Sequence, residues 1–412
     1  MSAGRGKSRY RPGRAILTGR EGVVFATTTV PGAKSLFRGQ LRWFRDQGWH
    51  PVLVSSPSAE SVALSEREGV PLVGIPMNRE ISLKRDLRSL AEWLCFLRRT
   101  RPAAVNVGTP KAALLGTVAG WLTGVPKRLY TVRGLRLEGA RGFEFGVLWL
   151  MEWITATLAT DVIPVSASLG DKLRALHLTP TRKMWLIGAG SSNGVDAAAV
   201  RAAADSAIER GLRRELGFCE EDFVVGFMGR VTGDKGINTL VSAMSLTDAE
   251  CVKLLVVGRV EDQESEALLS ALGKRLVRIE WTDHAWGHLA VLDALVLPTL
   301  REGFPNVVLE AAACGVPAIV TQATGAVDSV EHAQTGYHVP VGDARSIAQC
   351  VEKLAANPGM AQQLGAQARA RALAAFQPEH VWLGVEEILA SDSHPRYAKR
   401  WLKKGSAGRW QK

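Results

Sequence analysis

Short runs of aliphatic and β-branched residues alternate with longer stretches of helical period along almost the whole chain. The runs occupy residues 23–28, 51–56, 103–108, 128–132 and 162–166, and then 224–228, 253–258, 276–281, 294–299, 317–321 and 336–340. Strands that alternate with helices form parallel sheets with helices on both faces. Two such series, in a chain of 412 residues, predict an α/β protein with two doubly wound parallel-sheet domains rather than one large sheet.

These series set the predicted domain boundaries. An N-terminal Rossmann-like domain is expected at residues 21–195 and a C-terminal one at residues 196–376, joined near the glycine-rich segment 188–200. Residues 377–392 are expected to form a helix that packs back toward the N-terminal domain. Basic tails are predicted at both ends, a disordered one at residues 1–20 and an aromatic one at residues 393–412.

The stretch 82–99 shows how a helix face is predicted. Leu83, Leu87, Leu90, Leu94 and Leu97 follow one another at steps of four, three, four and three. This spacing places side chains on one side of a helix. We expect a helix here whose apolar face is marked by these leucines.

The net charge of +11 is concentrated in the two tails. Residues 1–20 contain six lysines and arginines, residues 393–412 contain seven, and neither segment contains an acid. The body is therefore close to neutral. Aromatic residues interleaved with the C-terminal bases favour an anionic lipid surface, although nucleic acid would select the same composition and a plain solubilising end explains the N-terminal tail.

Compartment and membrane topology are predicted from what the sequence lacks. The five cysteines show no CxxC spacing, which suits a reducing compartment. The N-terminus has no apolar signal-peptide core, and no apolar run reaches the roughly 18 residues of a spanning helix. The nearest candidate, residues 145–159, is interrupted by Glu152 and is interpreted as a packed helix rather than a membrane-dipping one.

The segment LREGFPNVVLEAAACGVPAIV, residues 300–320, carries an unusual glutamate. Pro305 is expected as the first residue of a helix that ends at Gly315, and this helix is apolar apart from Glu310. A carboxylate among apolar side chains needs a partner. Glu310 either leans toward solvent or pairs with an arginine, or it binds a ligand together with Glu302, which follows a strand end where α/β sheets bind ligands.

Arg230 and Lys235 flank a glycine loop in VVGFMGRVTGDKG, between a predicted strand and a helix that starts near Gly236. A guanidinium, an ammonium and free helix N–H groups together suit a diphosphate. An ordinary charged loop is the alternative. A site that binds a diphosphate beside two carboxylates, which accept hydrogen bonds from hydroxyl groups, suits a nucleotide sugar.

Two nucleotide motifs are not met. The dinucleotide fingerprint requires G-x-G-x-x-G, but the spacing of Gly188, Gly190 and Gly194 is G-x-G-x-x-x-G, which is one residue too long. The phosphate-binding motif G-x-x-x-x-G-K-[ST] does not occur. Nicotinamide cofactors and the common nucleotide triphosphatases are therefore disfavoured.

Taken together, GRVTGDKG, LVVG, EGFPNVVLE and AAACGVPAIVT closely resemble the C-terminal domain of family-4 retaining glycosyltransferases of GT-B fold. The N-terminal segments TTVPGAKSLFRGQLRWFRDQGWHPVLVSSPS, VNVGTPKAALLG, YTVRGLRLE and GSSNGVD are similar to the bacterial branch that assembles capsules, exopolysaccharides and O-antigens. The resemblance covers about residues 22–390 and implies two Rossmann-like domains that face a cleft.

The resemblance implies roles for residues of the C-terminal domain. Arg230 and Lys235 would hold the donor diphosphate, Glu310 the ribose, and Glu302 the donor sugar. Further substrate contacts are expected from the rest of the motif and from the base-binding turn beside Trp281, namely Gly303, Phe304, Pro305, Asn306 and Thr282.

In the N-terminal domain, the resemblance places Gly32 in a loop near the diphosphate and Lys111 among the substrate-binding residues. Arg133 stands where many members carry a histidine beside the reacting sugar. It is expected in the catalytic set, either stabilising the leaving diphosphate or supporting its loop.

The predicted activity is transfer of a hexose or N-acetylhexosamine from a UDP-sugar to a polyprenyl-diphosphate-linked saccharide, with retention and without a protein nucleophile. No cofactor and no metal are expected; His284 and His288 at helical spacing lack a third ligand nearby. We expect a cytoplasmic enzyme, peripheral on the anionic inner face of the plasma membrane, with no nucleic-acid partner. The alternatives are a sugar-nucleotide 2-epimerase or hydrolase of the same fold, and a basic-tailed nucleic-acid-binding protein.

Overall fold

The computed structural model describes residues 22–29, 36–78 and 82–391, which divide into two compact units. Unit 1 contains the described residues up to Pro164, then Leu173–Trp185 and the described chain from Trp382 onward. Unit 2 contains Val165–Lys172 and Leu186–Val381. Within the described residues, no helix is both long enough and apolar enough to cross a bilayer.

Unit 1 is built on a six-stranded parallel sheet with the strand order β3-β2-β1-β4-β5-β6. Its strands are β1 (Gly22–Ala26), β2 (His50–Ser55), β3 (Leu72–Gly74), β4 (Ala104–Val107), β5 (Lys127–Val132) and β6 (Asp161–Pro164). This is the order of a Rossmann sheet. Sequence analysis predicted every strand except β3, which has three residues, none of them fully buried.

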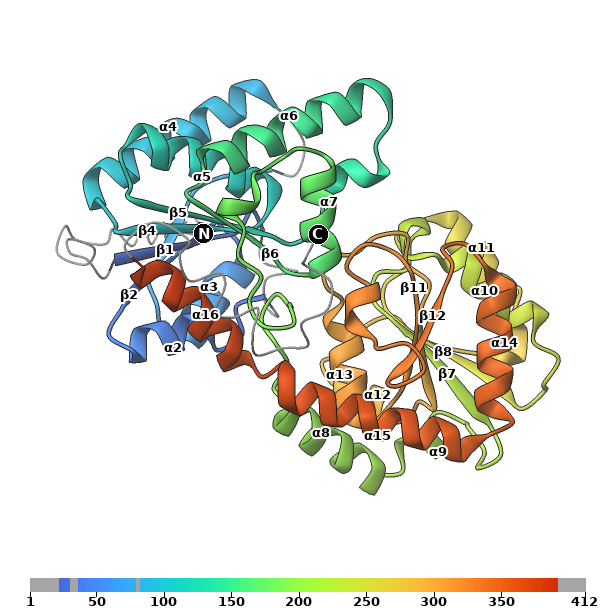
Figure 1. Cartoon of the computed structure of the whole chain (residues 1–412). Coiled ribbons are helices and arrows are strands. Elements are labelled where there is room, and N and C mark those ends of the chain that lie inside the picture. Colours follow the sequence, from blue (N-terminus) through green and yellow to red (C-terminus); the bar gives the residue numbers. More distant parts are fainter. Residues whose placement is uncertain (1–21, 30–35, 79–81, 392–412) are drawn as a thin grey trace, which may run out of the picture. The chain divides into compact units, whose positions relative to one another are not determined.

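Helices cover both faces of this sheet (Figure 1). One face carries α4 (Leu83–Thr100), α5 (Pro110–Leu122) and α6 (Gly142–Leu158); the other carries α2 (Gln40–Asp46) and α3 (Ala59–Glu68). Helix α7 (Ala167–Ala175) follows β6, and the short turns η2 (Arg136–Gly139) and η3 (Thr181–Lys183) complete the unit.

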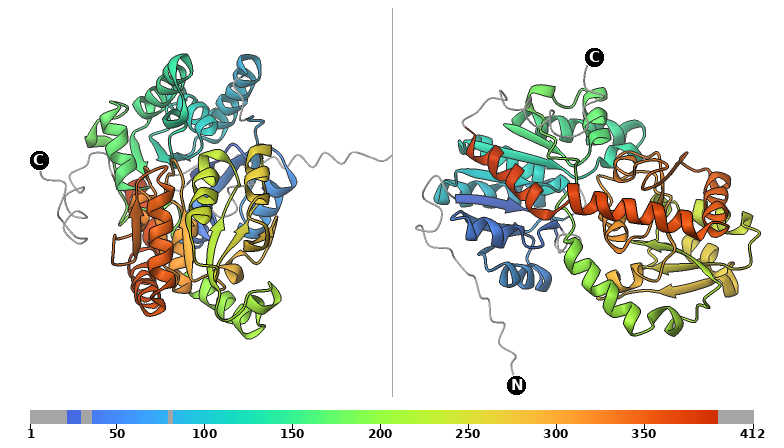
Figure 2. Two further views of the ribbon diagram at one scale, coloured as in Figure 1. Left: turned by 90° about the vertical axis from the view of Figure 1, so that its right-hand side faces the viewer. Right: turned by 60° about the horizontal axis from the view of Figure 1, so that its bottom comes forward.

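The C-terminal helix α16 (Pro378–Ala390) packs into unit 1 from Trp382 onward (Figure 2). The Trp382 ring lies 6.0 Å from the Trp43 ring, and Trp49 Nε1 donates a hydrogen bond to Glu386 Oε1 at 2.9 Å. Aromatic contacts therefore attach the end of the described chain to the region around α2.

The predicted leucine face of α4 is wrong. The side chains that α4 buries are Ser89, Trp93, Leu97 and Thr100, whereas Leu83 is 76% exposed and Leu87 58% exposed. The helix is rotated so that Trp93, the largest side chain, reaches the core. The leucine count ignored this residue, so only Leu97 was placed correctly.

Residues 145–158 lie in helix α6, which buries Leu148, Thr155 and Ala156 and shows how Glu152 is accommodated. Its carboxylate is 7% exposed and accepts a 2.5 Å hydrogen bond from the Tyr130 hydroxyl. Burial raises the pKa of Glu152 to about 7, and the bond from Tyr130 opposes this rise.

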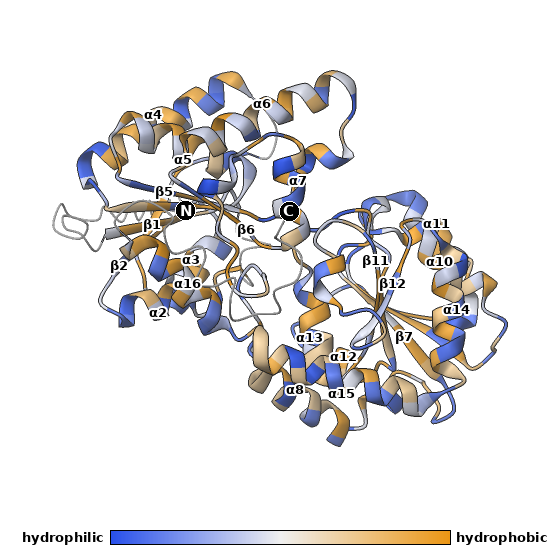
Figure 3. Cartoon of the chain, in the orientation of Figure 1, coloured by the Kyte–Doolittle hydropathy of each residue, from blue (hydrophilic) through white to orange (hydrophobic). Residues whose placement is uncertain are grey.

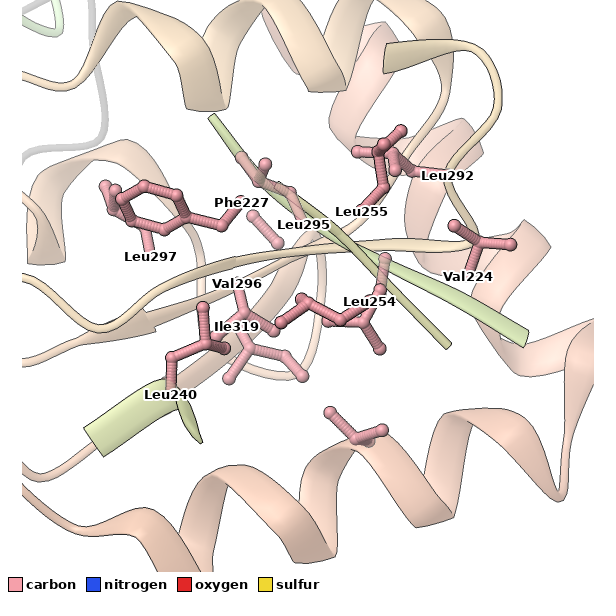
Figure 4. Close-up of a cluster of buried hydrophobic side chains, with 14 of the residues drawn as sticks. Val224, Phe227, Leu240, Leu254, Leu255, Leu292, Leu295, Val296, Leu297 and Ile319 are labelled. Carbon is pink, nitrogen blue, oxygen red and sulfur yellow. The ribbon is translucent and has the colours of Figure 1, made fainter. Parts of the chain in front are cut away.

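Unit 2 repeats the architecture with a second six-stranded parallel sheet, in the order β12-β11-β10-β7-β8-β9. Its strands are β7 (Phe223–Met228), β8 (Val252–Val257), β9 (Leu276–Ile279), β10 (Ala294–Leu297), β11 (Ala318–Thr321) and β12 (Gly336–Val339). Strands β7 and β10 are fully buried and form the centre of the core (Figure 4). All six were predicted. Five of them are buried along most of their length and give apolar runs, whereas the edge strand β9 is only partly buried.

The helices of unit 2 are α8 (Ala197–Glu209), α9 (Leu212–Glu215), α10 (Ile237–Leu246), α11 (Gln263–Ser270), α12 (Ala285–Leu289), α13 (Asn306–Cys314), α14 (Ala344–Ala355) and α15 (Pro358–Ala375). Three short turns, η4 (Gly233–Lys235), η5 (Gly273–Arg275) and η6 (Val327–Ser329), connect them. Helix α13 ends at Gly315 as predicted, but Pro305 precedes its first residue instead of being it, because its ψ of 102° is extended.

Candidate active site

The candidate site of unit 2 lies where strands β7 and β10 end. The two strands pair in parallel, so the loops at residues 229–236 and 298–305 leave the same edge of the sheet. The amide of Leu300 donates to the carbonyl of Asp234 at 3.0 Å, and the Thr299 hydroxyl donates to the same oxygen at 3.3 Å. The two loops therefore form one hydrogen-bonded structure at the sheet edge where α/β proteins bind ligands.

Lys235 and Glu302 meet between these loops. Lys235 Nζ lies 2.5 Å from Glu302 Oε1, and only 18% and 16% of the two side chains are exposed. Gly236 allows the close approach: its φ is +76°, and a Cβ there would lie 1.9 Å from the carbonyl oxygen of Pro298. The structure thus joins the predicted phosphate-binding cation to the predicted sugar-binding carboxylate.

Arg230 lies on the same loop and is more exposed, at 52%. Its guanidinium donates to Glu261 Oε2 at 2.9 Å and lies 3.9 Å from Asp234. Glu261 is held next to this loop because its amide donates to the carbonyl of Val231 at 3.1 Å. Arg230 therefore has carboxylate partners in the protein, as Lys235 has.

Asp234 connects the charges of the site. Its Oδ1 accepts a 2.5 Å hydrogen bond from Thr232. Burial by itself would raise the pKa of Asp234, but this bond and three nearby cations hold the pKa below its ordinary value; the cations are Lys235, Arg230 and Arg301. Sequence analysis missed Asp234, Glu261 and Arg301. Asp234 is next to Lys235 and Arg301 is next to Glu302 along the chain, whereas Glu261 has no predicted site residue near it in sequence.

The predicted sugar-binding segment is firmly packed. Gly303, Phe304 and Pro305 are buried, and the Phe304 ring lies 5.5 Å from the Phe376 ring. Asn306 Oδ1 is buried and has no hydrogen-bond partner among the described residues, which is rare for a buried polar atom. An acceptor of this kind at the start of α13 suits a hydroxyl donor.

Gly190, from the glycine-rich segment, packs against this region. A Cβ at Gly190 would lie 3.2 Å from the Phe304 ring and 2.6 Å from the carbonyl oxygen of Val165. Gly194 similarly lies against the backbone of Phe376 and Pro378. Gly190 and Gly194, two of the three glycines that failed the dinucleotide fingerprint, therefore serve close packing.

Glu310 lies at the border of the apolar core. Leu309 and Ala311 beside it are 1% and 0% exposed, while Glu310 itself is partly buried. Burial, and then the charge of Glu310, raise the pKa of the Cys314 thiol to about 12. This placement agrees with a solvent-edge or ion-paired carboxylate and equally with a ligand-binding one.

Thr282 lies apart from the paired loops, after the edge strand β9. Its hydroxyl accepts a 2.9 Å hydrogen bond from the amide of His284, and the neighbouring Trp281 is 68% exposed. His288 Nδ1 lies 2.9 Å from the carbonyl oxygen of His284, so this ring is hydrogen-bonded to the backbone.

In unit 1, Arg133 follows β5 at the carboxyl edge of the sheet. Its guanidinium lies 5.6 Å from the centre of the Phe37 ring, and its Nε occupies the space where Gly108 lacks a Cβ. Burial lowers the pKa of Arg133 to about 10, so it remains a cation at neutral pH. The side chain is thus held against the end of β4.

Lys111 has an acidic partner close to the same edge. It is 6% exposed, and its Nζ donates to both carboxylate oxygens of Asp86 at 2.7 and 2.8 Å. Gly32, the remaining predicted residue of the N-terminal domain, lies outside the described residues. Arg133 and Lys111 belong to unit 1, whereas the other described site residues belong to unit 2.

Two Rossmann-like units and a strand-edge site with an Arg/Lys pair beside acidic side chains define the class of two-domain glycosyltransferases. The family profile described as "Glycosyl transferases group 1" matches residues 209–371, and the "Glycosyl transferase 4-like domain" matches residues 32–190. The capsular polysaccharide biosynthesis glycosyltransferase CapM of Staphylococcus aureus is 36% identical over 371 residues, which span 89% of this chain and 96% of CapM. The chain belongs to the family-4 glycosyltransferases of GT-B fold, and it is an enzyme of that class.

Two further relatives are similar over most of the chain. An Escherichia coli enzyme named UDP-Gal:alpha-D-GlcNAc-diphosphoundecaprenol alpha-1,3-galactosyltransferase is 28% identical over 64% of this chain and 69% of its own length. The crystal structure of Anabaena Alr3699/HepE in complex with UDP and glucose has a TM-score of 0.75 at 20% identity, covering 90% of this chain and 99% of HepE. This structural likeness confirms the predicted fold.

Proposed function

We propose that the enzyme transfers a hexose or N-acetylhexosamine from a UDP-sugar to a polyprenyl-diphosphate-linked saccharide, with retention, during assembly of a capsule or related cell-surface polysaccharide. The observation that carries the donor half of this proposal is the 2.5 Å contact between Lys235 and Glu302 at the paired strand ends. It brings a phosphate-binding cation and a hydroxyl-binding carboxylate to one place.

The surrounding groups support a nucleotide-sugar donor. Arg230 adds a second cation on the same loop, and the ten-residue helix α10 begins at Ile237, two residues after Lys235, where the N–H groups of a first helical turn favour anions. Asn306 Oδ1, for which the described part of the chain offers no hydrogen-bond partner, suits a sugar hydroxyl. The HepE complexes with UDP, glucose and UDP-glucose support uridine as the base.

The acceptor is supported by relatives. The E. coli enzyme named above acts on a diphosphoundecaprenol-linked sugar, and the name of CapM assigns it to capsular polysaccharide biosynthesis. The location at the inner face of the membrane is part of the same proposal, since such acceptors are lipids. The basic tails to which we ascribe part of this association lie outside the described residues.

In the proposed reaction, the bond between the anomeric carbon and the diphosphate oxygen breaks while the acceptor hydroxyl oxygen bonds to the same face of that carbon. The acceptor proton passes to the leaving phosphate oxygen, so no protein nucleophile is needed. Arg230 and Lys235 stabilise the negative charge that develops on the diphosphate. When the donor binds, Lys235 and Glu302 separate: Lys235 binds phosphate oxygens, and Glu302 accepts hydrogen bonds from sugar hydroxyls. We propose no resident metal, so that EDTA leaves the transfer rate unchanged.

The donor test is calorimetric titration with UDP-, GDP- and TDP-sugars of the wild type, Glu310→Ala and a control variant, Glu220→Ala, in an exposed residue shortly before the amino end of β7. We expect one UDP-sugar to bind the wild type and the control, and Glu310→Ala to lose at least tenfold in affinity. If Glu310→Ala binds the UDP-sugar as tightly as the wild type, Glu310 does not bind the donor and is a solvent-edge or ion-paired carboxylate. Absence of nucleotide-sugar binding would refute the donor half of the proposal.

The acceptor test uses the bound UDP-sugar with and without a polyprenyl-diphosphate-linked saccharide. Transfer product that requires the acceptor, with the anomeric configuration of the donor by NMR, is expected. Epimerised or hydrolysed sugar formed from the donor alone would instead identify the alternative enzyme activity.

A further inference from the structure

The Ser168 hydroxyl joins two segments that lie far apart in the sequence. Ser168 is the second residue of α7, and its Oγ accepts a 2.7 Å hydrogen bond from the amide of Gly325, 157 residues further along the chain. The hydroxyl donates its own proton to Asp328 Oδ2 in the turn η6. All three residues belong to unit 2. One hydroxyl group therefore holds the segment after β11 at two residues, Gly325 and Asp328.

The carboxylate of Asp328 is directed at Ser168. Besides the hydroxyl, it accepts the backbone amide of Ser168, which lies 3.2 Å from Oδ2 and 3.4 Å from Oδ1. Burial raises the pKa of Asp328, and the hydrogen bonds from Ser168 oppose this rise. A partly buried carboxylate needs such donors, and both donors that reach it within the described chain belong to Ser168. Asp328 therefore fixes both the start of α7 and the orientation of the Ser168 hydroxyl.

Helix α15 fixes the turn that carries Asp328. Arg371 on this helix is 17% exposed, and its guanidinium donates to the carbonyl oxygens of Asp328 and Ser329 at 3.0 and 2.8 Å. Arg371 Nε also lies 3.0 Å from Glu331 Oε1. Hydrogen bonds from a charged donor are stronger than those between neutral groups. The carboxylate that holds the Ser168 hydroxyl is therefore itself presented from a firmly bonded turn.

Gly325 connects this arrangement to the predicted sugar-binding loop. The segment that contains it follows β11, a buried and hydrophobic strand (Figure 3). The backbone of Gly325 lies so close to the carbonyl groups of Glu302 and Gly303 that a Cβ would overlap both oxygens. The amide of Glu302 donates to the carbonyl oxygen of the adjacent Thr324. A displacement of Gly325 would therefore move the backbone that presents Glu302.

We propose that Ser168 and Asp328 are positioning residues for the donor sugar. They hold Gly325 in place, and Gly325 in turn holds the backbone of Glu302 and Gly303. The inference rests on the proposed function, in which this loop binds the sugar of a UDP-sugar. A supporting group fixes the geometry of a binding loop without touching the ligand. The predicted diphosphate-binding cations follow β7 on another loop, so the two positioning residues act on recognition of the sugar rather than of UDP.

Ser168→Ala in the full-length protein tests the proposal, with Ser166→Ala as its matched control. Ser166 is buried directly before α7, and its hydroxyl accepts the amide of Leu169 at 3.3 Å, so each variant removes one hydroxyl from the start of the same helix. We expect Ser168→Ala to bind the wild type's UDP-sugar at least tenfold more weakly but UDP within twofold of the wild type. Ser166→Ala should keep both affinities within twofold. Ser168→Thr, which retains the hydroxyl, should recover UDP-sugar affinity to within threefold, whereas a merely structural role would leave the ratio of the two affinities unchanged.

A second pair of variants tests the carboxylate and carries the experiment if Ser168→Ala does not fold. Asp328→Asn keeps one acceptor oxygen but loses the charge, so we expect a smaller loss of UDP-sugar affinity, about three- to tenfold, with UDP affinity unchanged. Asp343→Asn is the control, because Asp343 bonds to Ser346 at the start of α14 in the same way, through the amide at 3.0 Å and the hydroxyl at 2.6 Å. It should leave both affinities unchanged.

Hydrogen exchange of the ligand-free protein measures the loop without any donor. We expect faster exchange at residues 300–306 and 322–327 in Ser168→Ala but not in Ser166→Ala. Unchanged exchange in these segments, or equal UDP-sugar affinities of the two variants, would overturn the inference, and an equal loss of UDP and UDP-sugar affinity would make Ser168 merely structural. If the wild type binds no UDP-sugar, the proposed function fails instead, and the exchange difference still decides whether Ser168 holds the loop.

Discussion

Gly325 supports the predicted sugar-binding loop without belonging to it, and Gly325→Ala therefore tests that loop indirectly. Gly325 lies between β11 and η6 with a φ of +75°. A Cβ there would be 2.3 Å from the carbonyl oxygen of Gly303 and 2.6 Å from that of Glu302. The neighbouring Thr324 accepts a 2.9 Å hydrogen bond from the amide of Glu302, so the two loops are coupled.

The size of the effect can be worked from these distances. Real Cβ contacts are essentially absent below 3.0 Å, so the Gly303 carbonyl must move by about 0.7 Å. Misplacing a binding group by about 1 Å costs up to about 100-fold in rate. We expect Gly325→Ala to lose roughly 10- to 100-fold in kcat/KM, or about 1.4 to 2.7 kcal/mol of transition-state stabilisation.

Gly342→Ala is the matched control. Its φ is +80°, in the same unit, and nothing lies within 4 Å of its Cβ position. Both variants should lose about 1 kcal/mol of folding free energy from left-handed backbone strain. Initial transfer rates, UDP-sugar calorimetry and thermal unfolding separate the two effects. If Gly325→Ala keeps the donor affinity and kcat/KM of Gly342→Ala within twofold, the Gly303 loop does not position the donor.

Three further predictions concern ionisable side chains. Burial raises the pKa of Glu152 from 4.5 to about 7, so the folded state binds the Glu152 proton more tightly than the unfolded state, and folding stability is lost as the pH rises through 7. Glu152→Gln should remove this pH dependence of the unfolding free energy and raise that free energy by up to about 3 kcal/mol at pH 8. Glu144→Gln, on the same helix, is the control and should leave the pH dependence unchanged. Lys111→Met should lower the unfolding free energy by about 1 to 3 kcal/mol, because Asp86 loses its ammonium partner, and should leave the donor affinity unchanged. If the variant instead loses transfer activity at unchanged stability, Lys111 is an acceptor-binding residue. Glu261→Gln should tighten UDP-sugar binding by about two- to fivefold at low salt, because Glu261 no longer competes with the donor for the exposed Arg230. Glu264→Gln is the control and should not change the affinity. Equal affinities for the two variants would contradict this competition.

The sheets could be predicted because parallel strands are buried on both faces. The runs of the central strands, such as that of β7, consist of residues with almost no exposure, so their apolar pattern is continuous. Strand β3 lacks this signal, because it has only three residues and lies at the edge of its sheet. Helix α4 failed differently: Leu83 and Leu87 are apolar yet exposed, so the spacing of the leucines did not identify the buried face.

The site was predictable to the extent that it follows strand ends. Arg230 and Lys235 follow β7, Glu302 follows β10, and neighbouring parallel strands bring such loops together whatever lies between them in sequence. Glu261 and Gly325 were missed because they come from the loops after β8 and β11. Their roles depend on contacts within 3 Å, which no spacing along the chain encodes.

The contact between Lys235 and Glu302 changes how donor recognition is explained. The sequence suggests two independent groups, one for phosphate and one for sugar, but in the structure each group is the partner of the other. A ligand that takes Lys235 alone leaves a largely buried carboxylate unpaired, which opposes the gain in binding. With the proposed donor, UDP alone would be such a ligand, whereas a UDP-sugar would supply phosphate oxygens to the lysine and hydroxyls to the glutamate. We therefore expect the pair to favour the complete donor over the diphosphate product, and this preference requires no residue beyond the two that the loops of β7 and β10 bring together.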